Sequence, residues 1–489
     1  MSFFVRSSNA GLRVQTEKEQ KERFVSHYIV YFTQFNVVFA YSTIITGIWP
    51  YLNKLDPSAD KSNLGYLLGL SALGQTIFAP ILGYWSNYLK STRIPFVVSL
   101  IICLISYIIH ATLETFDNHR KYWFLFSRFL AGTGGACITL CRSHVSTTTL
   151  MRERRKAVSI LSSCSTIALA LGPALQFAVV PLGDEGVWLI RNKLKLDMYT
   201  AIGWIVFIIT VINIILFHPA IFKEHSMLKE DNGDDNNTYT SKNYKYLAWV
   251  FIVMNFCVTF NFMFTKLLGT PMAMDEFAMT RPEAITLNSL VMCVTAAISF
   301  ISILLINPIC KLVSEMKLLI FGMVLLVVGR FCFYPLGGSL VVFDDTDLNV
   351  NATRIGCPKS QDWCSTERRV LFHQFIIGNV LENIGYSFAI TLIMAIFSKV
   401  LGSRQQGTWM GFLTSMGSIA RITSPIFIST LYKVYGPSVV VIVTNLIFLL
   451  FGIALVKLAH DFILGEEAVE VITATIPESC KDTLLEEIK

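Results

Sequence analysis

Charged residues are scarce in this chain: they make up 15% of its 489 residues, whereas hydrophobic residues make up 53%. An ordinary soluble domain carries about 25% charged residues. A soluble protein of this length would fold into two or three domains, and each would need a polar surface. The shortage of charge therefore excludes a soluble enzyme and indicates an integral membrane protein.

Two further absences exclude classes of function. The net charge is +6, but the basic residues are spread over many short loops and form no stripe, which excludes a nucleic-acid partner. The chain also lacks His-Glu-x-x-His, Gly-x-Ser-x-Gly and paired aspartates in facing helices. We therefore expect a protein that is not an enzyme and that needs no cofactor.

Long apolar runs, in contrast, recur along the whole chain. A helix that spans a bilayer needs about 20 apolar residues, whereas a membrane β-strand needs about 10 alternating ones. Twelve runs fit the helical length: 24–50, 64–86, 94–113, 122–143, 157–182, 197–218, 246–269, 282–306, 317–336, 370–397, 407–432 and 438–460. The sequence predicts an all-α membrane protein with twelve transmembrane helices.

The distribution of basic residues predicts the orientation in the membrane. Residues 1–23 are polar and basic, and they lack the short apolar segment and cleavage site of a signal peptide. A second basic cluster, Arg152–Lys156, lies on the same predicted side. Because basic loops remain in the cytosol, we expect both tails, 1–23 and 461–489, to be cytosolic.

The one long loop on the opposite side, 337–369, has the chemistry of a luminal segment. It contains a glycosylation sequon at Asn351, and it contains Cys357 and Cys364 at a spacing that fits a small disulfide loop. No His or third Cys lies beside this pair, so we expect no metal site. A second sequon, at Asn236, lies on the predicted cytosolic side and should stay unmodified.

A polar linker, 219–245, divides the chain into two halves of six predicted helices, 24–218 and 246–460. A shift of 252 residues superimposes part of one half on the other, and the matched positions include Leu161 with Leu413, Gly172 with Ser424 and Pro173 with Pro425. Like halves around a central site are typical of alternating-access carriers. The mid-helix prolines are either flexing points or static kinks.

Three motifs resemble the major facilitator superfamily. They are Gly83 to Lys90 with Arg93 after the second predicted helix, Arg128-x-x-x-Gly132-x-Gly134 in the fourth, and Gly172-Pro173 in the fifth. The resemblance implies two pseudo-symmetric six-helix bundles, the major facilitator fold. We expect Gly132 and Gly134 to permit close helix packing.

Longer strings are similar to a lysosomal branch of that superfamily. They are Trp85 to Tyr88, Arg142-Ser143, Leu171 to Pro173, the segment from Cys357 to Cys364, and Gly411 to Pro425. This resemblance implies a multi-pass protein of the lysosomal or late endosomal membrane. Chloride permeation has been attributed to that branch, and the substrate of any carrier activity is unsettled.

Two departures from the superfamily pattern have consequences. Asn87 occupies a position that is usually acidic, so an ionic latch to a neighbouring helix is lost. Arg142 would then need another partner, and we expect Glu153 in the next loop. Gln176 and Phe177 replace a Gly-Gly that is typical of drug–proton antiporters, which counts against drug efflux.

Ionisable residues at membrane depth are costly and are therefore candidates for function. Glu382 and Arg421 lie at matching depth on consecutive predicted helices, either as an anion- and proton-binding pair or as a permanent ion pair. Arg128 is a fixed positive charge that suits an anion, or else a packing residue. We expect Arg330, near a helix end, to extend to the lipid headgroups.

Polar side chains form stripes along two predicted helices, and these stripes should face a cavity or neighbouring helices. They are His27, Tyr31, Gln34 and Tyr41 on the first helix, and Asn255, Thr259 and Lys266 on the seventh. His27 and His373, near opposite faces of the membrane, either sense the pH of the lumen or cytosol or are simply solvated, and we expect the second.

Three functions fit these features. The leading hypothesis is a carrier that moves a small, anionic solute by alternating access, with Glu382 coupling transport to protons. The second is a chloride-conducting channel on the same scaffold. The third is a receptor or scaffold that transports nothing. In each case we expect a monomer surrounded by membrane lipids.

Overall fold

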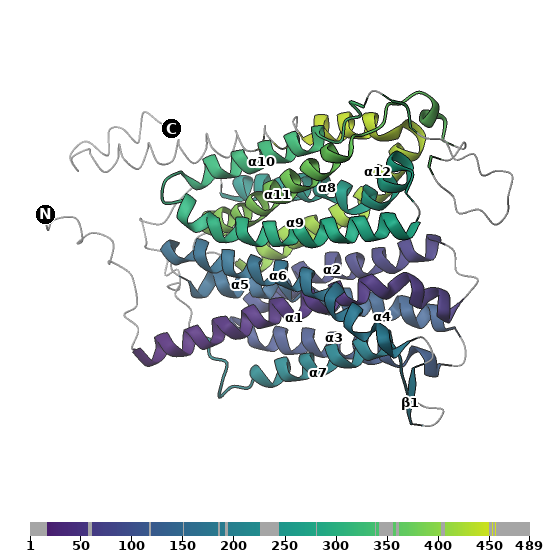
Figure 1. The fold of residues 1–489 in the computed structure, drawn as a ribbon. Coiled ribbons are helices and arrows are strands. Elements are labelled where there is room, and N and C mark those ends of the chain that lie inside the picture. Colours follow the sequence, from purple (N-terminus) through teal and green to yellow (C-terminus); the bar gives the residue numbers. More distant parts are fainter. Residues whose placement is uncertain are drawn as a thin grey trace, which may run out of the picture.

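A computed structural model describes residues 17–56, 61–116, 119–149, 151–183, 186–190, 194–224, 244–279, 281–337, 339–341, 356–357, 361–401, 406–448, 452 and 455. These residues form long helices that run side by side in two bundles (Figure 1). The sequon Asn351 and most of the linker 219–245 lie outside the described residues.

The amino-terminal bundle contains the first seven helices and one small hairpin. Its elements are α1 (Glu17–Leu55), α2 (Lys61–Leu89), α3 (Arg93–Ala111), α4 (Arg120–Gly135), α5 (Ile138–Thr148), α6 (Met151–Val179), β1 (Val187–Ile190), β2 (Leu194–Leu196) and α7 (Thr200–Leu216). The predicted helix 122–143 is divided between α4 and α5. Gly132, Gly134 and Gly135 lower the helix propensity just before the break.

The carboxy-terminal bundle contains α8 (Tyr244–Phe277), α9 (Arg281–Ile309), α10 (Glu315–Phe331), α11 (Phe372–Leu401) and α12 (Gln406–Ile447). The α12 segment turns at Gly436, whose φ of 76° and ψ of −176° suit glycine alone. The turn separates the two predicted helices 407–432 and 438–460. Since most residues after Phe448 lie outside the described part, the twelfth helix stays a prediction.

Eight described helical segments are long and apolar enough to cross a membrane, and α7 is a shorter apolar helix. We call the end of the molecule where α1 and α12 begin the terminal face, and the end where α1 finishes and α12 turns the loop face (Figure 1). One large apolar cluster crosses from bundle to bundle and includes Leu140, Leu161, Met410 and Leu413.

The two bundles make close contact on the terminal side through α2 and α12. A Cβ atom on Gly411 would lie 2.6 Å from Cα of Pro80, and the backbones at Gly83 and Gly407 approach even more closely. The Asn87 side chain donates to Oγ1 of Thr408 at 2.8 Å and accepts from the Gly407 amide at 3.1 Å. These glycines therefore let the helices touch, and Asn87 satisfies a free amide at the start of α12.

Polar contacts near the chain reversals also join the bundles on this side. Ser398 donates to Oγ of Ser146 at 2.7 Å, and the two serines are 252 residues apart, which equals the shift that superimposes the two halves of the sequence. Arg154, which is fully buried, donates to the Ser398 carbonyl at 2.7 Å. Glu315 accepts from Arg155 at 2.8 Å and from Lys399 at 2.6 Å. In this structure the bundles are thus joined on the terminal side.

Candidate functional site: an arginine pair between the bundles

Arg142 of α5 and Arg421 of α12 come from opposite bundles and share one polar network. Arg142 donates to Oγ1 of Thr414 at 3.0 Å. Arg421 donates to Oγ of Ser418 at 2.8 Å and to Oε1 of Gln75 in α2. Thr414 and Ser418 are one helical turn apart, so a single face of α12 holds both guanidinium groups.

Within the described residues, no acidic side chain balances the charges of this network. Arg142 and Arg421 repel each other electrostatically, and the Tyr386 phenol interacts with both. Within the described part of the chain, no carboxylate pairs with either guanidinium, since their recorded partners are hydroxyl and amide oxygens. Because arginine keeps its proton in proteins, two fixed positive charges meet here. A bound anion would supply the missing negative charge.

Arg421 lies deep in the molecule. It is about 15 residues from the start of α12, or ~22 Å along the helix axis. Both arginines are partly exposed rather than sealed. Arg142 lies six residues, or ~9 Å, before the end of α5, so the pair lies between the two bundles and extends from the terminal side toward the middle of α12.

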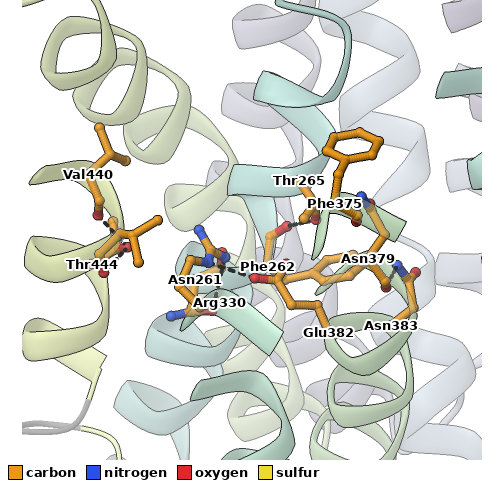
Figure 2. A network of polar contacts seen from close by, with 11 residues as sticks. Asn261, Phe262, Thr265, Arg330, Phe375, Asn379, Glu382, Asn383, Val440 and Thr444 are labelled. Atoms are coloured by element: carbon orange, nitrogen blue, oxygen red, sulfur yellow. Dashed lines mark hydrogen bonds and ion pairs between the residues drawn. The ribbon is translucent and has the colours of Figure 1, made fainter. Parts of the chain in front are cut away.

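Glu382 does not join this pair, contrary to the expected match with Arg421. It accepts from Nε of Arg330 at 2.6 Å, and both side chains are 0% exposed. Figure 2 shows Arg330 between Glu382 and Asn261, whose backbone and side-chain oxygens also accept from the guanidinium. The Phe264 ring lies 3.9 Å from the guanidinium carbon. The expectation that Arg330 extends to the headgroups is therefore wrong, because a neighbouring helix supplies its counter-charge.

Arg128 occupies a separate position nearer the loop face. Its side chain lines a small pocket with residues of α1 and α2: Tyr41, Ile48, Leu67, Leu68 and Ser71. Arg128 is 4% exposed. It lies 14 positions before Arg142 along α4 and α5, or ~21 Å if the helix were continuous.

Three members of the two polar stripes, His27, Gln34 and Asn255, bond to neighbouring helices. Gln34 donates to Ser165 at 2.8 Å, and Asn255 donates to the Leu413 carbonyl at 2.9 Å. Tyr31 and Thr259 are buried, with exposed fractions of 9% and 3%. Lys266, in contrast, is exposed, and its Nζ lies 5.1 Å from the Phe262 ring centroid.

The two histidines differ. His27 was expected to be solvated, but it is buried and bonds to Oγ1 of Thr148 at 2.7 Å. The reason is that α1 begins well before residue 24, so His27 lies inside the bundle rather than at its surface. His373 is exposed, as expected.

The motif residues hold helices together. Glu153 pairs with Arg23 at 3.7 Å and not with Arg142, so the expected partner was wrong. Arg93 donates to the Phe217 carbonyl at 2.9 Å, at the end of α7. Gly132 packs directly against the Ser71 backbone.

Two remaining sets have the expected local structure. Cys357 and Cys364 form a disulfide. Both Gly-Pro and Ser-Pro pairs lie inside continuous helices: Gly172 and Pro173 in α6, and Ser424 and Pro425 in α12. Gly172 lies against Ser42 of α1, which explains why this position has no side chain.

Sequence reasoning missed Gln75, which bonds to Arg421 and Ser418. The available signal was a lone amide within the apolar run 64–86. It also missed Arg154 and Ser398 at the junction between the bundles. The internal repeat could have indicated Ser398, because Ser146 is its equivalent.

Comparison with known proteins agrees with this architecture. The model of the Major Facilitator Superfamily matches residues 28–346. The chain belongs to the Major Facilitator Superfamily. Major facilitator superfamily domain-containing protein 8 of Xenopus laevis is 30% identical over 88% of this chain and 90% of that protein. The superfamily consists of membrane transporters, so this chain is a multi-pass transporter-family protein.

Solved structures of the superfamily have the same fold. The human organic anion transporter MFSD10 has a TM-score of 0.58 and 15% identity, covering 88% of this chain and 99% of that one. The E. coli fucose:proton symporter has a TM-score of 0.63 and 12% identity, covering 90% and 99%. An outward-facing bacterial homologue of the iron transporter ferroportin has a TM-score of 0.62 and 10% identity, covering 88% and 98%.

Proposed function

We propose that this protein is a carrier that moves a small anionic solute across the membrane of an acidic organelle by alternating access. The observation that carries the proposal is the arginine pair, Arg142 and Arg421, which lies between the bundles without a carboxylate partner in the described residues. Two uncompensated charges at this depth are costly unless an anion binds them. A carboxylate or phosphate could bridge both guanidinium groups.

Alternating access is supported by where the bundles touch. Their hydrogen bonds gather toward the terminal face, at Asn87, Ser146, Arg154 and Arg155. A carrier must break such contacts and form others at the opposite face to release its solute. The contacts at Asn87 and Ser146 are neutral hydrogen bonds, and Arg155 belongs to a partly exposed ionic cluster, so these are weak enough individually to exchange. The bond from the buried Arg154 guanidinium is charge-assisted and is the strongest of the set.

The organelle is proposed from similarity. The segments Trp85 to Tyr88 and Gly411 to Pro425 resemble a lysosomal branch of the superfamily, and Major facilitator superfamily domain-containing protein 8 aligns with 88% of this chain. The disulfide of Cys357 and Cys364 fits an oxidising lumen at the loop face. Under this orientation the loop face meets the acidic side. Glu382 is enclosed with Arg330 in this structure, so we assign the proton-coupling role to it only for a state in which that pair opens.

The test is uptake into vesicles that contain the purified protein, with small carboxylates, phosphate and chloride supplied at pH 5 outside and 7 inside, and the reverse. We expect saturable, exchangeable uptake of at least one anion. Arg421→Gln and Arg142→Gln should each reduce it at least about tenfold, since each removes a charge-assisted contact. Lys317→Gln removes an exposed positive charge elsewhere and is the matched control.

Two outcomes would reject the carrier. A chloride current that scales with the gradient, without saturable uptake or exchange, would indicate the channel instead. Unchanged uptake in the double variant of Arg142 and Arg421 would remove the pair from the pathway.

A further inference from the structure

A third cation, Lys266 of α8, lies near the arginine pair. Its side chain is exposed, and its ammonium group lies 5.1 Å from the centroid of the Phe262 ring. Because Phe262 is one turn earlier in α8, the lysine side chain points back toward the terminal side. Phe262 in turn stacks on Tyr386 of α11, with ring centroids 3.8 Å apart. Tyr386 is the residue that interacts electrostatically with both arginines.

Lys266 and Arg421 lie at similar depths on neighbouring helices. Asn255 of α8 donates to the Leu413 carbonyl of α12 at 2.9 Å, and this bond aligns the two helices. Both helices run from the terminal face toward the loop face (Figure 1). From the bond, Arg421 is eight residues, or ~12 Å, nearer the loop face, and Lys266 is eleven residues, or ~16 Å, nearer it. The two charges therefore differ in depth by less than one helical turn.

The positive charge of this region is divided between two places. Lys266 lies against Phe262, whereas the two arginines lie beside Tyr386. Within the described residues, the carboxylate that interacts with Lys266 is already paired: Glu382 accepts from Arg330 at 2.6 Å, and both side chains are 0% exposed. A solute with one negative charge between the arginines would therefore leave the lysine without compensation.

We propose that the solute of this site is a small organic dicarboxylate and that Lys266 selects for its second charge. One carboxylate would lie between Arg142 and Arg421, and the other would accept from Lys266. The hydrocarbon chain between them would lie against the partly exposed Tyr386 ring. A phosphate group fits less well, because it holds all its charges on one centre. The inference rests on the proposed function, since it names the solute class for the same arginine pair.

The experiment measures binding of glutarate and of its monoamide to the purified full-length protein in detergent at pH 7, by calorimetry. The two probes have the same chain length, but the monoamide carries one negative charge instead of two. We expect glutarate to bind at least about tenfold more tightly, because it makes a second charge-assisted contact. Lys266→Gln should reduce that ratio to about twofold or less and should leave monoamide binding within about twofold.

Three variants separate this role of Lys266 from a structural one. Lys266→Arg keeps the positive charge and should retain most of the preference for glutarate. Lys433→Gln removes an exposed cation from the loop-side part of α12 and should leave both affinities within about twofold. Arg421→Gln should weaken both probes at least about tenfold, because each places a carboxylate between the arginines.

Specific outcomes overturn the inference. Equal affinity for the two probes in the wild type would reject it, as would a preference for glutarate that persists in Lys266→Gln. Equal losses of both probes in Lys266→Gln would show that the lysine does not select for the second charge.

Failure of this inference can be told apart from failure of the carrier proposal. Absence of binding by either probe would reject a dicarboxylate, while vesicle uptake of phosphate and chloride would still test the arginine pair. The carrier proposal fails instead if anion uptake survives the double variant of Arg142 and Arg421, whatever the charge preference of the wild type.

Discussion

Two places in the molecule hold deep arginines in opposite ways: the interior of the carboxy-terminal bundle and the contact between the two bundles. Arg330 is fully enclosed with Glu382, receives two further contacts from Asn261 and lies over the Phe264 ring. Arg142 and Arg421 are partly exposed, repel each other and bond only to neutral oxygens in the described residues. Depth in the membrane is therefore a poor guide to function by itself. The partner of the charge is what separates a structural arginine from a ligand-binding one.

The energetics of the two arrangements differ for the same reason. Removing one member of a buried ion pair leaves the other charge without compensation, which costs about 3–5 kcal/mol. Removing one of two like charges that have no acid partner relieves repulsion. The contrast makes predictions of opposite sign for stability.

The largest expected effect is on the enclosed pair. Glu382→Gln should lower the free energy of unfolding by about 3–5 kcal/mol, because Arg330 would remain charged and buried with only the neutral oxygens of Asn261 as strong partners. The measurement is thermal unfolding and yield of monodisperse protein in detergent. The double variant Arg330→Met with Glu382→Leu should recover most of the loss, since it removes both charges. Equal damage in the single and double variants would contradict this account.

The second effect concerns the arginine pair. Arg421→Gln should change the free energy of unfolding by less than about 1 kcal/mol, or raise it, while uptake falls. Thermal unfolding without added anion measures the first quantity. Repeating the measurement with a saturating anion should stabilise the wild type more than the variant, because the anion binds the intact pair more tightly. A variant as unstable as Glu382→Gln would show that this pair is structural as well.

A third, smaller effect concerns Glu276, a buried carboxylate that forms no ion pair with the described residues. Glu276 lies beyond the apolar part of α8, is 0% exposed, and accepts from the Val370 amide at 2.8 Å through one oxygen only. Burial raises its pKa to about 8, with Glu367 and Asp275 adding to the rise while the Val370 amide and Arg369 oppose it.

The sign of the pH effect follows from that raised pKa. The folded protein keeps a proton on Glu276 that the unfolded chain loses near pH 4.5, so its stabilising contribution is complete below that pH and falls as the pH rises toward 8. We expect a melting temperature a few degrees higher at pH 5 than at pH 7.5, and a smaller difference in Glu276→Gln. An unchanged pH dependence in that variant would contradict the assignment.

The smallest effect is at the junction of α2 and α12. Asn87→Ala removes the acceptor for the Gly407 amide, which is worth about 1 kcal/mol for a helix amino-terminal cap. Hydrogen exchange in the first turn of α12 should accelerate about fivefold. Asn87→Asp keeps the oxygen and should remain near the wild-type rate. No acceleration in Asn87→Ala would show that the bundles stay joined without this residue.

The sequence predicted the positions of the helices better than the contacts between their side chains. Apolar runs located the helical segments because a bilayer fixes their length, but the break between α4 and α5 depends on local glycine content, which hydropathy does not measure. Arg421 was identified from its depth. Its partner was not, because depth says nothing about which way a side chain points around its helix axis.

The unknown direction of a side chain also explains the wrong predictions for Arg330 and Glu153. Arg330 is near the end of α10, so its position along the chain suggested the headgroups, while Glu382 and Asn261 enclose it from two other helices. Glu153 is close to Arg142 in sequence, but the turn after α5 directs it to Arg23. Contacts between helices that are far apart in the chain can be identified only once the arrangement of the helices is known.

The hydrogen bond between Ser146 and Ser398 has an evolutionary consequence. If a pseudo-twofold axis relates the two halves, two positions separated by one repeat length can touch only where that axis passes between them. In a symmetric dimer of six-helix subunits, the ancestral serine at this place would have contacted its own copy. Fusion of the two subunits into one chain would have preserved that contact. Each copy would then have been free to diverge in the rest of its sequence.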